Sequence, residues 1–381
     1  MNILFISNDP SMFDEASEAR ARMRTYAEAV GESGGVLHIL SRSLKAGEVV
    51  DGPLVLHGVR GPRLLLPGKL AGKGRKLVVK HGIDVVSAQD PFEHGWAALR
   101  AVRGTKAKLH LQVHTDYCSP WFTLSGIYRS PRVPVSRLNG LRVHIADRVV
   151  KEADGIRVVS ERVKESMLAR YGDAIPEPSV IPIRVSTEVP SKVALPELPF
   201  TFALIAVSRL EPEKRIPDIF AVLVRLKDAY PSLGLVLVGD GRERKKLERL
   251  ARKLGIANRV VFLGHRSDAW GLMQSAQAFI QASAYEGYGR TLIEAALAEV
   301  PILTSDVGIV GEVFKGYENA FVAPVGDPTN LAALTAQLIE DPYAREMLAI
   351  EGKRAAVEHL GKVKNRAGDV IGDIARAYEV T

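Results

Sequence analysis

Short apolar runs alternate with helical patterns along most of the chain. In the first half, apolar runs at 2–7, 36–41, 84–88, 108–114 and 155–160 predict strands, and 14–30 and 161–172 have helical spacing. In the second half, strands are predicted at 200–208, 233–239, 259–264, 278–283 and 300–305, and the clearest helix at 242–255. Apolar strands separated by helices are typical of a parallel sheet covered on both faces. The pattern therefore predicts an α/β protein.

One interruption of this pattern predicts two domains. Residues 172–199 contain six prolines and show no helical period, as expected of a linker. A chain of 381 residues is also too long for one compact core. We predict two doubly wound domains, 1–185 and 200–363, joined by a linker at 186–199. Ligands of such sheets bind beyond the carboxyl ends of the strands, so we expect a site in a cleft between facing domains.

Composition excludes several classes of protein. The chain is 46% hydrophobic and 25% charged, which is ordinary for a globular protein. No apolar run approaches the roughly 18 residues of a membrane-spanning helix, and the first residues lack the basic region of a signal peptide. Cys118 is the only cysteine, which excludes an internal disulfide and a thiolate metal cluster. A cytoplasmic location is expected.

The basic excess lies entirely in the first half. Residues 1–185 hold 27 Lys and Arg against 19 Asp and Glu, whereas the remainder holds 24 against 25. Residues 57–80 contain seven bases and no acid. Such a face attracts an anionic lipid at the inner membrane surface or a phosphorylated substrate, and a plain solvated surface is the alternative. No nucleic-acid motif or interleaving of bases with aromatics is present, so nucleic acid is not expected as a partner. The basic segment 116–145 has no strand pattern and is predicted to be a lid or acceptor-side loop.

Two cations follow the first strand of the second half. Arg209 and Lys214 lie five residues apart on one predicted loop, where both could converge on a single anion. The alternative is a surface pair beside Glu211 and Glu213.

Gly239 and Gly241 end the next strand of the second half. They allow either a close approach of backbone to a ligand or only a tight turn. The third glycine of a dinucleotide fingerprint would fall at Arg244, so that motif fails.

The stretch "YEGYGRTLIE" places a glycine-rich turn between two carboxylates. The turn consists of Gly287, Tyr288, Gly289 and Arg290, and a helix is expected from Thr291 with Glu294 on its first turn. The N–H groups at a helix N-terminus favour a phosphate, while Glu286 and Glu294 can accept hydrogen bonds from sugar hydroxyls. The pattern suits a ligand of the form sugar–diphosphate–sugar. The alternative is that Glu294 caps its own helix and Glu286 is solvated.

These motifs together resemble those of the retaining GT-B glycosyltransferases of family 4, the glycosyl transferases group 1. "SRLEPEKR", "VGDG", "NRVVFLG", "EGYGRTLIEA" and "PILTSDVG…GE" stand in the order and at the spacings of that family. Glu286 and Glu294 match its E-x7-E motif. The resemblance implies a GT-B fold, with two Rossmann-like domains facing across a cleft and a last helix, at about 364–381, that returns to the first domain.

The resemblance also implies roles for these residues. Arg209 and Lys214 would hold the donor diphosphate, Glu294 the ribose and Glu286 the hydroxyls of the transferred sugar. Backbone groups of Gly287–Thr291 would line the sugar and phosphates, and Gly239 and Gly241 would approach the donor.

Three other polar residues are candidates for the site. His114 stands where the family has a histidine near the reacting sugar carbon, although a core histidine at a strand end is the alternative. Asp116 is its weaker companion, and His265 lies where contacts to the base are expected.

The implied reaction is transfer of a sugar from a UDP-, GDP- or ADP-sugar to a hydroxyl acceptor, with retention and without a cofactor. The expected pathway is synthesis of cell-envelope polysaccharide or glycolipid. The chain contains no acidic D-x-D pair for a divalent ion, so metal independence is expected. A GT-B epimerase or phosphorylase, or an inactive sugar-nucleotide-binding protein, are the alternatives.

The chain departs from the family pattern at three places. The loop 7–17 lacks the usual glycine pair, which leaves the acceptor open, and Arg22 or Arg24 could supply cations there. Arg215 replaces a glycine that often follows the lysine, and Gly308-Ile309 replaces a glycine pair.

Overall fold

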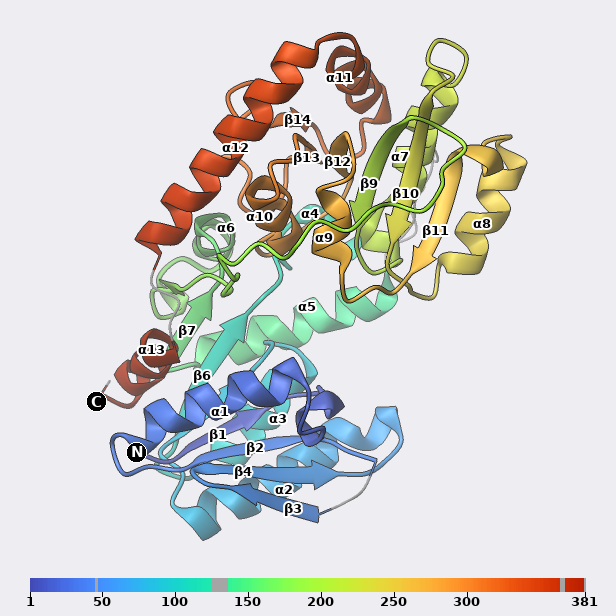
Figure 1. Ribbon diagram of the computed structural model, residues 1–381. Coiled ribbons are helices and arrows are strands. Elements are labelled where there is room, and N and C mark those ends of the chain that lie inside the picture. The colour runs from blue at the N-terminus through green and yellow to red at the C-terminus, as the bar shows by residue number, and fades with distance from the viewer. Residues whose placement is uncertain (45–46, 125–135, 364–366, 380–381) are drawn as a thin grey trace. The chain divides into compact units, whose positions relative to one another are not determined.

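The computed structural model describes residues 1–44, 47–124, 136–363 and 367–379. The chain divides into two compact units (Figure 1). Unit 1 comprises Met1–Cys118, Arg137–Pro182 and Lys364–Thr381, and unit 2 comprises Ser119–Ser136 and Ile183–Val363. Parts of the predicted lid, 125–135, and of the predicted last helix, 364–366 and 380–381, lie outside the described residues.

Unit 1 is built on an eight-stranded sheet in the order β3-β4-β2-β1-β5-β6-β7-β8. Its strands are β1 (Ile3–Ile6), β2 (Leu37–Arg42), β3 (Gly47–Asp51), β4 (Leu54–Val59), β5 (Val85–Ala88), β6 (Lys108–Val113), β7 (Gly155–Val158) and β8 (Ser179–Val180). Neighbouring strands are parallel, except that β3 and β4 form an antiparallel hairpin at the edge. The five strands predicted in this half are present, whereas the hairpin β3–β4 and the two-residue strand β8 were not predicted.

Helices cover both faces of this sheet because successive side chains of a strand point to opposite sides. One face of β1, with Ile3 and Phe5, packs against α1 (Glu18–Gly31) and α13 (Ala367–Glu379). The opposite face, with Ile6, lies under α2 (Leu66–His81), and α3 (Glu93–Val102) packs beside α2. The further helices of unit 1 are α5 (Arg137–Val149), α6 (Glu161–Tyr171) and four short 3-10 turns, η1 (Pro10–Phe13), η2 (Arg63–Leu65), η3 (Val150–Glu152) and η4 (Gly172–Ala174).

Two predictions for unit 1 are corrected by the structure. The segment 116–145 was predicted to be a loop, but its last part forms α5. Leu138, Leu141 and Ile145 have the helical spacing, and the polar residues and the glycine between them obscured it. The first helix was predicted from residue 14 but begins at Glu18, because Ser17 caps it by accepting a hydrogen bond from the Arg20 amide.

Unit 2 contains a parallel six-stranded sheet in the order β11-β10-β9-β12-β13-β14. Its strands are β9 (Phe202–Val207), β10 (Leu233–Val238), β11 (Val260–Gly264), β12 (Ala278–Gln281), β13 (Ile302–Ser305) and β14 (Phe321–Ala323). Its helices are α4 (Pro120–Thr123), α7 (Ile216–Leu226), α8 (Arg244–Lys253), α9 (Ala269–Met273), α10 (Arg290–Leu297), α11 (Pro328–Glu340) and α12 (Pro342–Lys362), with 3-10 turns η5 (Pro212–Lys214) and η6 (Ala257–Arg259).

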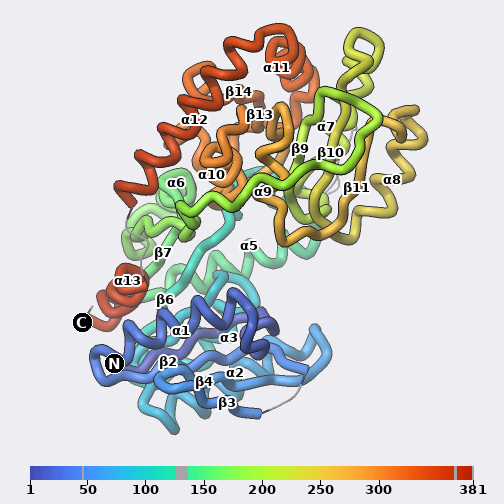
Figure 2. The backbone as a smooth tube through the Cα atoms, viewed as in Figure 1, coloured from blue at the N-terminus to red at the C-terminus, as the bar shows by residue number. Residues whose placement is uncertain are grey.

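The proline-rich segment before β9 runs without regular structure across unit 2 (Figure 2). It packs on the α9 region through three hydrogen bonds: Val193 N to Gly271 O at 3.0 Å, Gln274 Nε2 to Pro190 O at 2.7 Å and Ser275 Oγ to Val193 O at 2.8 Å. The space beside Gly271 is filled by this segment, since a Cβ there would lie 2.6 Å from the Ser191 carbonyl oxygen. The segment is therefore ordered on unit 2.

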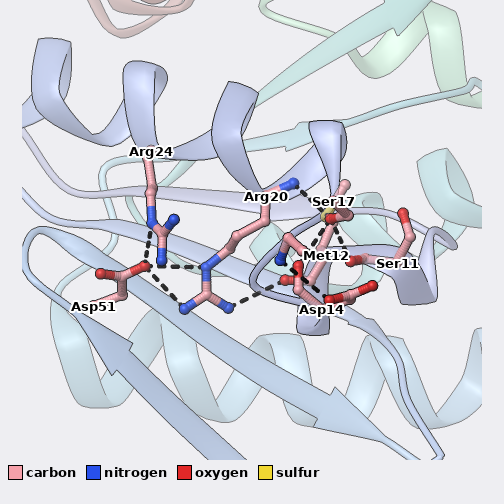
Figure 3. Close-up of polar contacts among 8 residues, drawn as sticks. Ser11, Met12, Asp14, Ser17, Arg20, Arg24 and Asp51 are labelled. Carbon is pink, nitrogen blue, oxygen red and sulfur yellow. Dashed lines mark hydrogen bonds and ion pairs between the residues drawn. The ribbon is translucent and has the colours of Figure 1, made fainter.

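A buried arginine fixes the loop that follows β1, where the family glycine pair is missing (Figure 3). Arg20 is 1% exposed and donates through Nη1 to the Met12 carbonyl at 3.1 Å. Its Nε and Nη2 donate to Asp51 Oδ2 at 3.0 and 2.9 Å, and the half-exposed Arg24 donates to the same oxygen at 2.7 Å. These bonds tie the turn η1 (Pro10–Phe13) to α1 and to the end of β3.

We predict that Arg20→Met lowers the midpoint of thermal unfolding of unit 1 by about 5 °C, because buried charge-assisted hydrogen bonds are lost. Arg24→Met removes a partly exposed pair with the same carboxylate and should cost about 1–2 °C. Differential scanning calorimetry of both variants checks this. Equal losses would show that burial of Arg20 is not what stabilises the loop.

Candidate active site

The loops with the predicted donor residues meet at the carboxyl edge of the unit 2 sheet. From β9 the chain builds β10 and β11 on one side, and from β12 it builds β13 and β14 on the other. The strand order therefore reverses between β9 and β12, where open α/β sheets bind their ligands. The loop 208–215 follows β9 and the loop 282–289 follows β12 (Figure 1). Their backbones bond directly, since Ala284 N donates to Glu213 O at 2.8 Å.

An ion pair joins the same two loops. Lys214 Nζ lies 2.5 Å from Glu286 Oε1, and both side chains are about 15% exposed. Ser283 Oγ donates to the same carboxylate oxygen at 2.7 Å. The alternative in which Glu286 is merely solvated is therefore wrong. The pair presents one ammonium and one carboxylate side by side, which can bind a phosphate and a sugar hydroxyl respectively.

Arg209 is oriented differently from Lys214. Its side chain is 75% exposed, and Nη2 lies 3.2 Å from Glu213 Oε1. This contact is the surface pair that the sequence left open. Such a pair is weak, so the guanidinium can leave Glu213 for a stronger anion at little cost.

Gly239 and Gly241 make room for protein backbone. A Cβ on Gly239 would lie 1.9 Å from the Ser208 carbonyl oxygen, and one on Gly241 would lie 2.5 Å from that of Leu210. Leu210 N also donates to Asp240 O at 2.9 Å. Of the two sequence interpretations, these contacts support the tight turn, which here packs against the loop that carries Arg209.

The glycine-rich turn forms the N-terminus of α10. Gly289 has φ 95° at the cap position, and α10 begins at Arg290. Glu294 therefore lies beyond the first turn, and the predictions that it sits on that turn or caps the helix are wrong. Its Oε1 instead accepts from Arg290 Nε at 2.6 Å, four residues earlier. Thr291 Oγ1 donates to Gln281 Oε1 at 3.2 Å, which anchors the turn on β12.

Tyr288 connects the glycine-rich turn to α12. It is 1% exposed, and its hydroxyl lies 2.9 Å from His359 Nε2 on α12. Burial raises the pKa of Tyr288 and lowers the pKa of His359. Gly308, with φ 60°, packs against the same turn, because a Cβ there would lie 2.4 Å from the Tyr288 carbonyl oxygen. No motif in the sequence points to His359, which lies 71 positions from Tyr288.

Arg215 occupies a position where the family often has glycine. Its backbone adopts a conformation that favours glycine. Its φ of 47° lies in the left-handed region, which costs a non-glycine residue about 1 kcal/mol. Its side chain offsets this, because Nε donates to Asp218 Oδ2 at 2.7 Å. Burial raises the pKa of Asp218, and the bond from Arg215 opposes that shift.

The remaining predicted residues lie outside this group. His265 is exposed after β11. In unit 1, His114 follows β6 and is half-buried, and Asp116 is buried and accepts from Ser166 Oγ at 3.4 Å. Burial, followed by the nearby cations Arg157 and Arg22, lowers the pKa of His114 to about 3, so the imidazole is neutral at pH 7.

The described ranges of the chain contain neither a group of metal-ligating side chains nor a membrane-spanning helix. Within them no three His, Cys, Asp or Glu side chains are grouped so as to hold a metal ion. Nor does any helix in these ranges combine the length and apolarity needed to cross a membrane.

Comparison with known families identifies both halves of the chain. Residues 197–355 match the model of the glycosyl transferases group 1, and residues 23–189 match that of Glycosyltransferase Family 4. The chain belongs to the glycosyl transferases group 1. The two matches together span most of the chain, and the first of them includes the loops 208–215 and 282–289.

Curated glycosyltransferases with different names match parts of this chain. Glycogen synthase of Mycobacterium tuberculosis is 30% identical over 58% of this chain and 53% of its own. The putative glycosyltransferase EpsD of Bacillus subtilis is 30% identical over 46% of each chain. The lipopolysaccharide core biosynthesis glycosyltransferase LpsD of Rhizobium meliloti is 30% identical over 49% of this chain and 50% of its own. The chain thus spans about half the length of the curated relatives it matches.

Solved structures of low sequence identity share the whole fold. Sucrose-phosphate synthase from Thermosynechococcus elongatus aligns with a TM-score of 0.77 at 19% identity, over 99% of this chain and 98% of that one. HepE of Anabaena, solved in complex with UDP-glucose, aligns with a TM-score of 0.71 at 20% identity over the full length of both. The family member therefore has the GT-B fold that its sequence predicted.

We predict that His114 weakens folding in acid. Because its folded pKa lies below the ordinary value of 6.5, only the unfolded chain takes up this proton as the pH falls from 6.5 towards 3. Between pH 6.5 and 4.5 the wild type should lose up to about 1.4 kcal/mol per pH unit more than His114→Gln. Urea unfolding across this range checks it, and parallel curves for both proteins would contradict the low pKa.

Proposed function

We propose that this chain transfers a sugar from a nucleotide-diphosphate sugar to a hydroxyl acceptor. The observation that carries the proposal is the Lys214–Glu286 pair at the β9–β12 reversal, beside the N-terminus of α10. Glu286 would contact hydroxyls of the transferred sugar, and Glu294, after release from Arg290, would bind the ribose. HepE, a neighbour in fold, binds UDP-glucose, which supports a nucleotide-sugar donor.

The mechanism follows from where charge develops. Breaking the bond between the anomeric carbon and the diphosphate leaves negative charge on the phosphates and positive character on the sugar. Lys214, the loosely paired Arg209 and the amides that open α10 would stabilise the leaving group. The acceptor hydroxyl would attack the face that the diphosphate leaves and pass its proton to an oxygen of the leaving phosphate, which retains the anomeric configuration. Since the chain has no D-x-D pair, we propose that these groups act without a divalent ion.

His114 would act as a neutral group. An imidazole with a pKa of about 3 cannot carry a positive charge at pH 7, so it would contribute a hydrogen bond to the reacting sugar.

The acceptor class is proposed from the relatives. Their names point to synthesis of envelope or storage polysaccharide: lipopolysaccharide core synthesis for LpsD and glycogen synthesis for the Mycobacterium tuberculosis enzyme. We propose an acceptor of this kind, met in the cytoplasm or at the inner membrane face.

The experiment that tests the reaction is nucleotide release from a panel of UDP-, GDP- and ADP-sugars, with and without EDTA. Lys214→Ala should slow turnover about 100-fold or more, because it removes a charge aimed at the leaving group. Glu294→Ala should weaken donor binding about tenfold or more. Lys353→Ala, which breaks an exposed pair with Glu299, is the matched control and should behave as wild type.

The outcomes separate the alternatives. Release of one nucleotide that EDTA does not change, and that the Lys214 variant loses, supports the transferase. Binding without turnover, even with polysaccharide acceptors, would favour an inactive sugar-nucleotide-binding protein. Turnover to an isomerised sugar, or only with free phosphate, would favour the epimerase or the phosphorylase.

We propose further that unit 1 meets an anionic membrane surface. Leu64 and Leu65 are 90% and 57% exposed in η2, between Arg63 and the acid-free basic helix α2. Leu44, 86% exposed, follows β2, whose last residue is paired with the last residue of β4 just before η2. Apolar side chains flanked by bases are suited to a bilayer interface with anionic lipid.

We expect the protein to co-sediment with phosphatidylglycerol vesicles and not with neutral vesicles, and to be released by salt. Leu64→Ser with Leu65→Ser should weaken this binding about fivefold or more, since two apolar side chains no longer insert. Ile350→Ser, at an exposed apolar position of unit 2, is the control. Equal binding to neutral and anionic vesicles would contradict the proposal.

A further inference from the structure

A short arm, defined here as residues 119–123, belongs to unit 2, although the chain up to Cys118 and again from Arg137 to Pro182 belongs to unit 1. It begins with Ser119, whose hydroxyl accepts from the Trp121 amide at 3.4 Å and caps α4. At the other end of the arm, the Thr123 carbonyl accepts a hydrogen bond from Ser136 N at 2.8 Å. The motifs and roles assigned above leave this arm without a function.

The first contact of the arm is between Trp121 and Arg215. The Arg215 guanidinium lies 5.5 Å from the centroid of the indole ring. Gly326 lies against both side chains, because a Cβ at this position would be 3.3 Å from an atom of Arg215 and 3.3 Å from an atom of Trp121. An arginine over an indole is an attractive cation–π contact.

The second contact is between Phe122 and Tyr285. Phe122 is 4% exposed, and the two ring centroids lie 5.3 Å apart with the planes at 63°. This edge-to-face geometry is favourable beyond the apolar area that it buries.

Both partners stand next to donor-loop residues. Arg215 follows Lys214, and Tyr285 precedes Glu286, so one arm touches both loops that the Lys214–Glu286 pair joins. The left-handed backbone of Arg215 favours glycine, yet the position carries the long side chain that bonds Asp218 and lies on Trp121. A glycine at this position would leave the indole without its cation.

We infer that Trp121 and Phe122 are positioning residues, which hold the loops 208–215 and 282–289 so that Lys214 and Glu286 face the same ligand. Trp121 fixes the first loop through Arg215, and Phe122 fixes the second through Tyr285. The inference rests on the proposed function for the identity of that ligand, whereas the ordering of the loops is a property of the free protein.

The test compares Trp121→Ala, Trp121→Phe and Arg345→Ala. Phenylalanine keeps an aromatic face for Arg215 and is the conservative variant. Arg345 makes a cation–π contact with Phe202, 5.4 Å from the ring centroid, and Arg345→Ala is the control within unit 2. Amide hydrogen exchange is followed for peptides that cover 208–216 and 282–289, and the dissociation constants of UDP, GDP and ADP are measured by calorimetry.

Trp121→Ala should speed exchange in 208–216 about fivefold or more, and weaken the preferred nucleotide by a similar factor, because the indole no longer holds Arg215. Trp121→Phe should stay within about twofold of wild type, and Arg345→Ala should leave both loops unchanged. Unchanged exchange in 208–216 for Trp121→Ala would overturn the inference, as would faster exchange throughout unit 2. If the wild type binds no nucleotide, the proposed donor fails while the exchange data still decide the role of the arm.

Discussion

The ion pair between Lys214 and Glu286 is the contact around which the candidate site is organised. It forms only because β9 and β12 are neighbours, although 72 positions separate the two residues in the chain. The backbone bond from Ala284 to Glu213 and the hydroxyl of Ser283 hold the two loops in place around it. Removing one partner from a largely buried ion pair of this kind, whose side chains are 16% and 15% exposed, leaves an uncompensated charge and is costly. An anionic ligand that takes the lysine must therefore bring groups that satisfy the glutamate, as a diphosphate joined to a sugar does.

The glycines of the family motifs serve this arrangement mainly by letting loops approach one another. Gly239, Gly241 and Gly308 each lie where a Cβ would collide with the backbone of a neighbouring loop. Arg215 shows the converse, since its side-chain contacts offset an unfavourable backbone conformation. In the first unit, the loop without the glycine pair is instead fixed by buried Arg20. Departures from a motif thus have visible replacements in this chain.

Much of the fold follows from the sequence, because strongly apolar strands such as β9 and β10 dominate their segments. Five of the six strands of unit 2, and the turn Gly287–Arg290 before a helix, were predicted within a few residues, whereas the short strand β14 was not. The hairpin β3–β4 and helix α5 were not predicted. Charged residues interrupt the apolar pattern of β3 and α5, whereas β4 is an apolar run that was missed. The candidate donor residues could be named from spacing alone. Their pairings could not, because contacts such as Tyr288 with His359 arise only when distant elements pack.

The central claim is that the β9 and β12 loops bind the diphosphate of a nucleotide sugar. A crystal structure of the protein with the nucleotide diphosphate that binds best tests it directly. The account predicts phosphate oxygens at about 2.7–3.2 Å from Lys214 Nζ and from the amides at the start of α10. The account also predicts that Lys214 has moved away from Glu286 and that the ribose lies on Glu294. A nucleotide bound elsewhere, with the Lys214–Glu286 pair intact, would contradict the account.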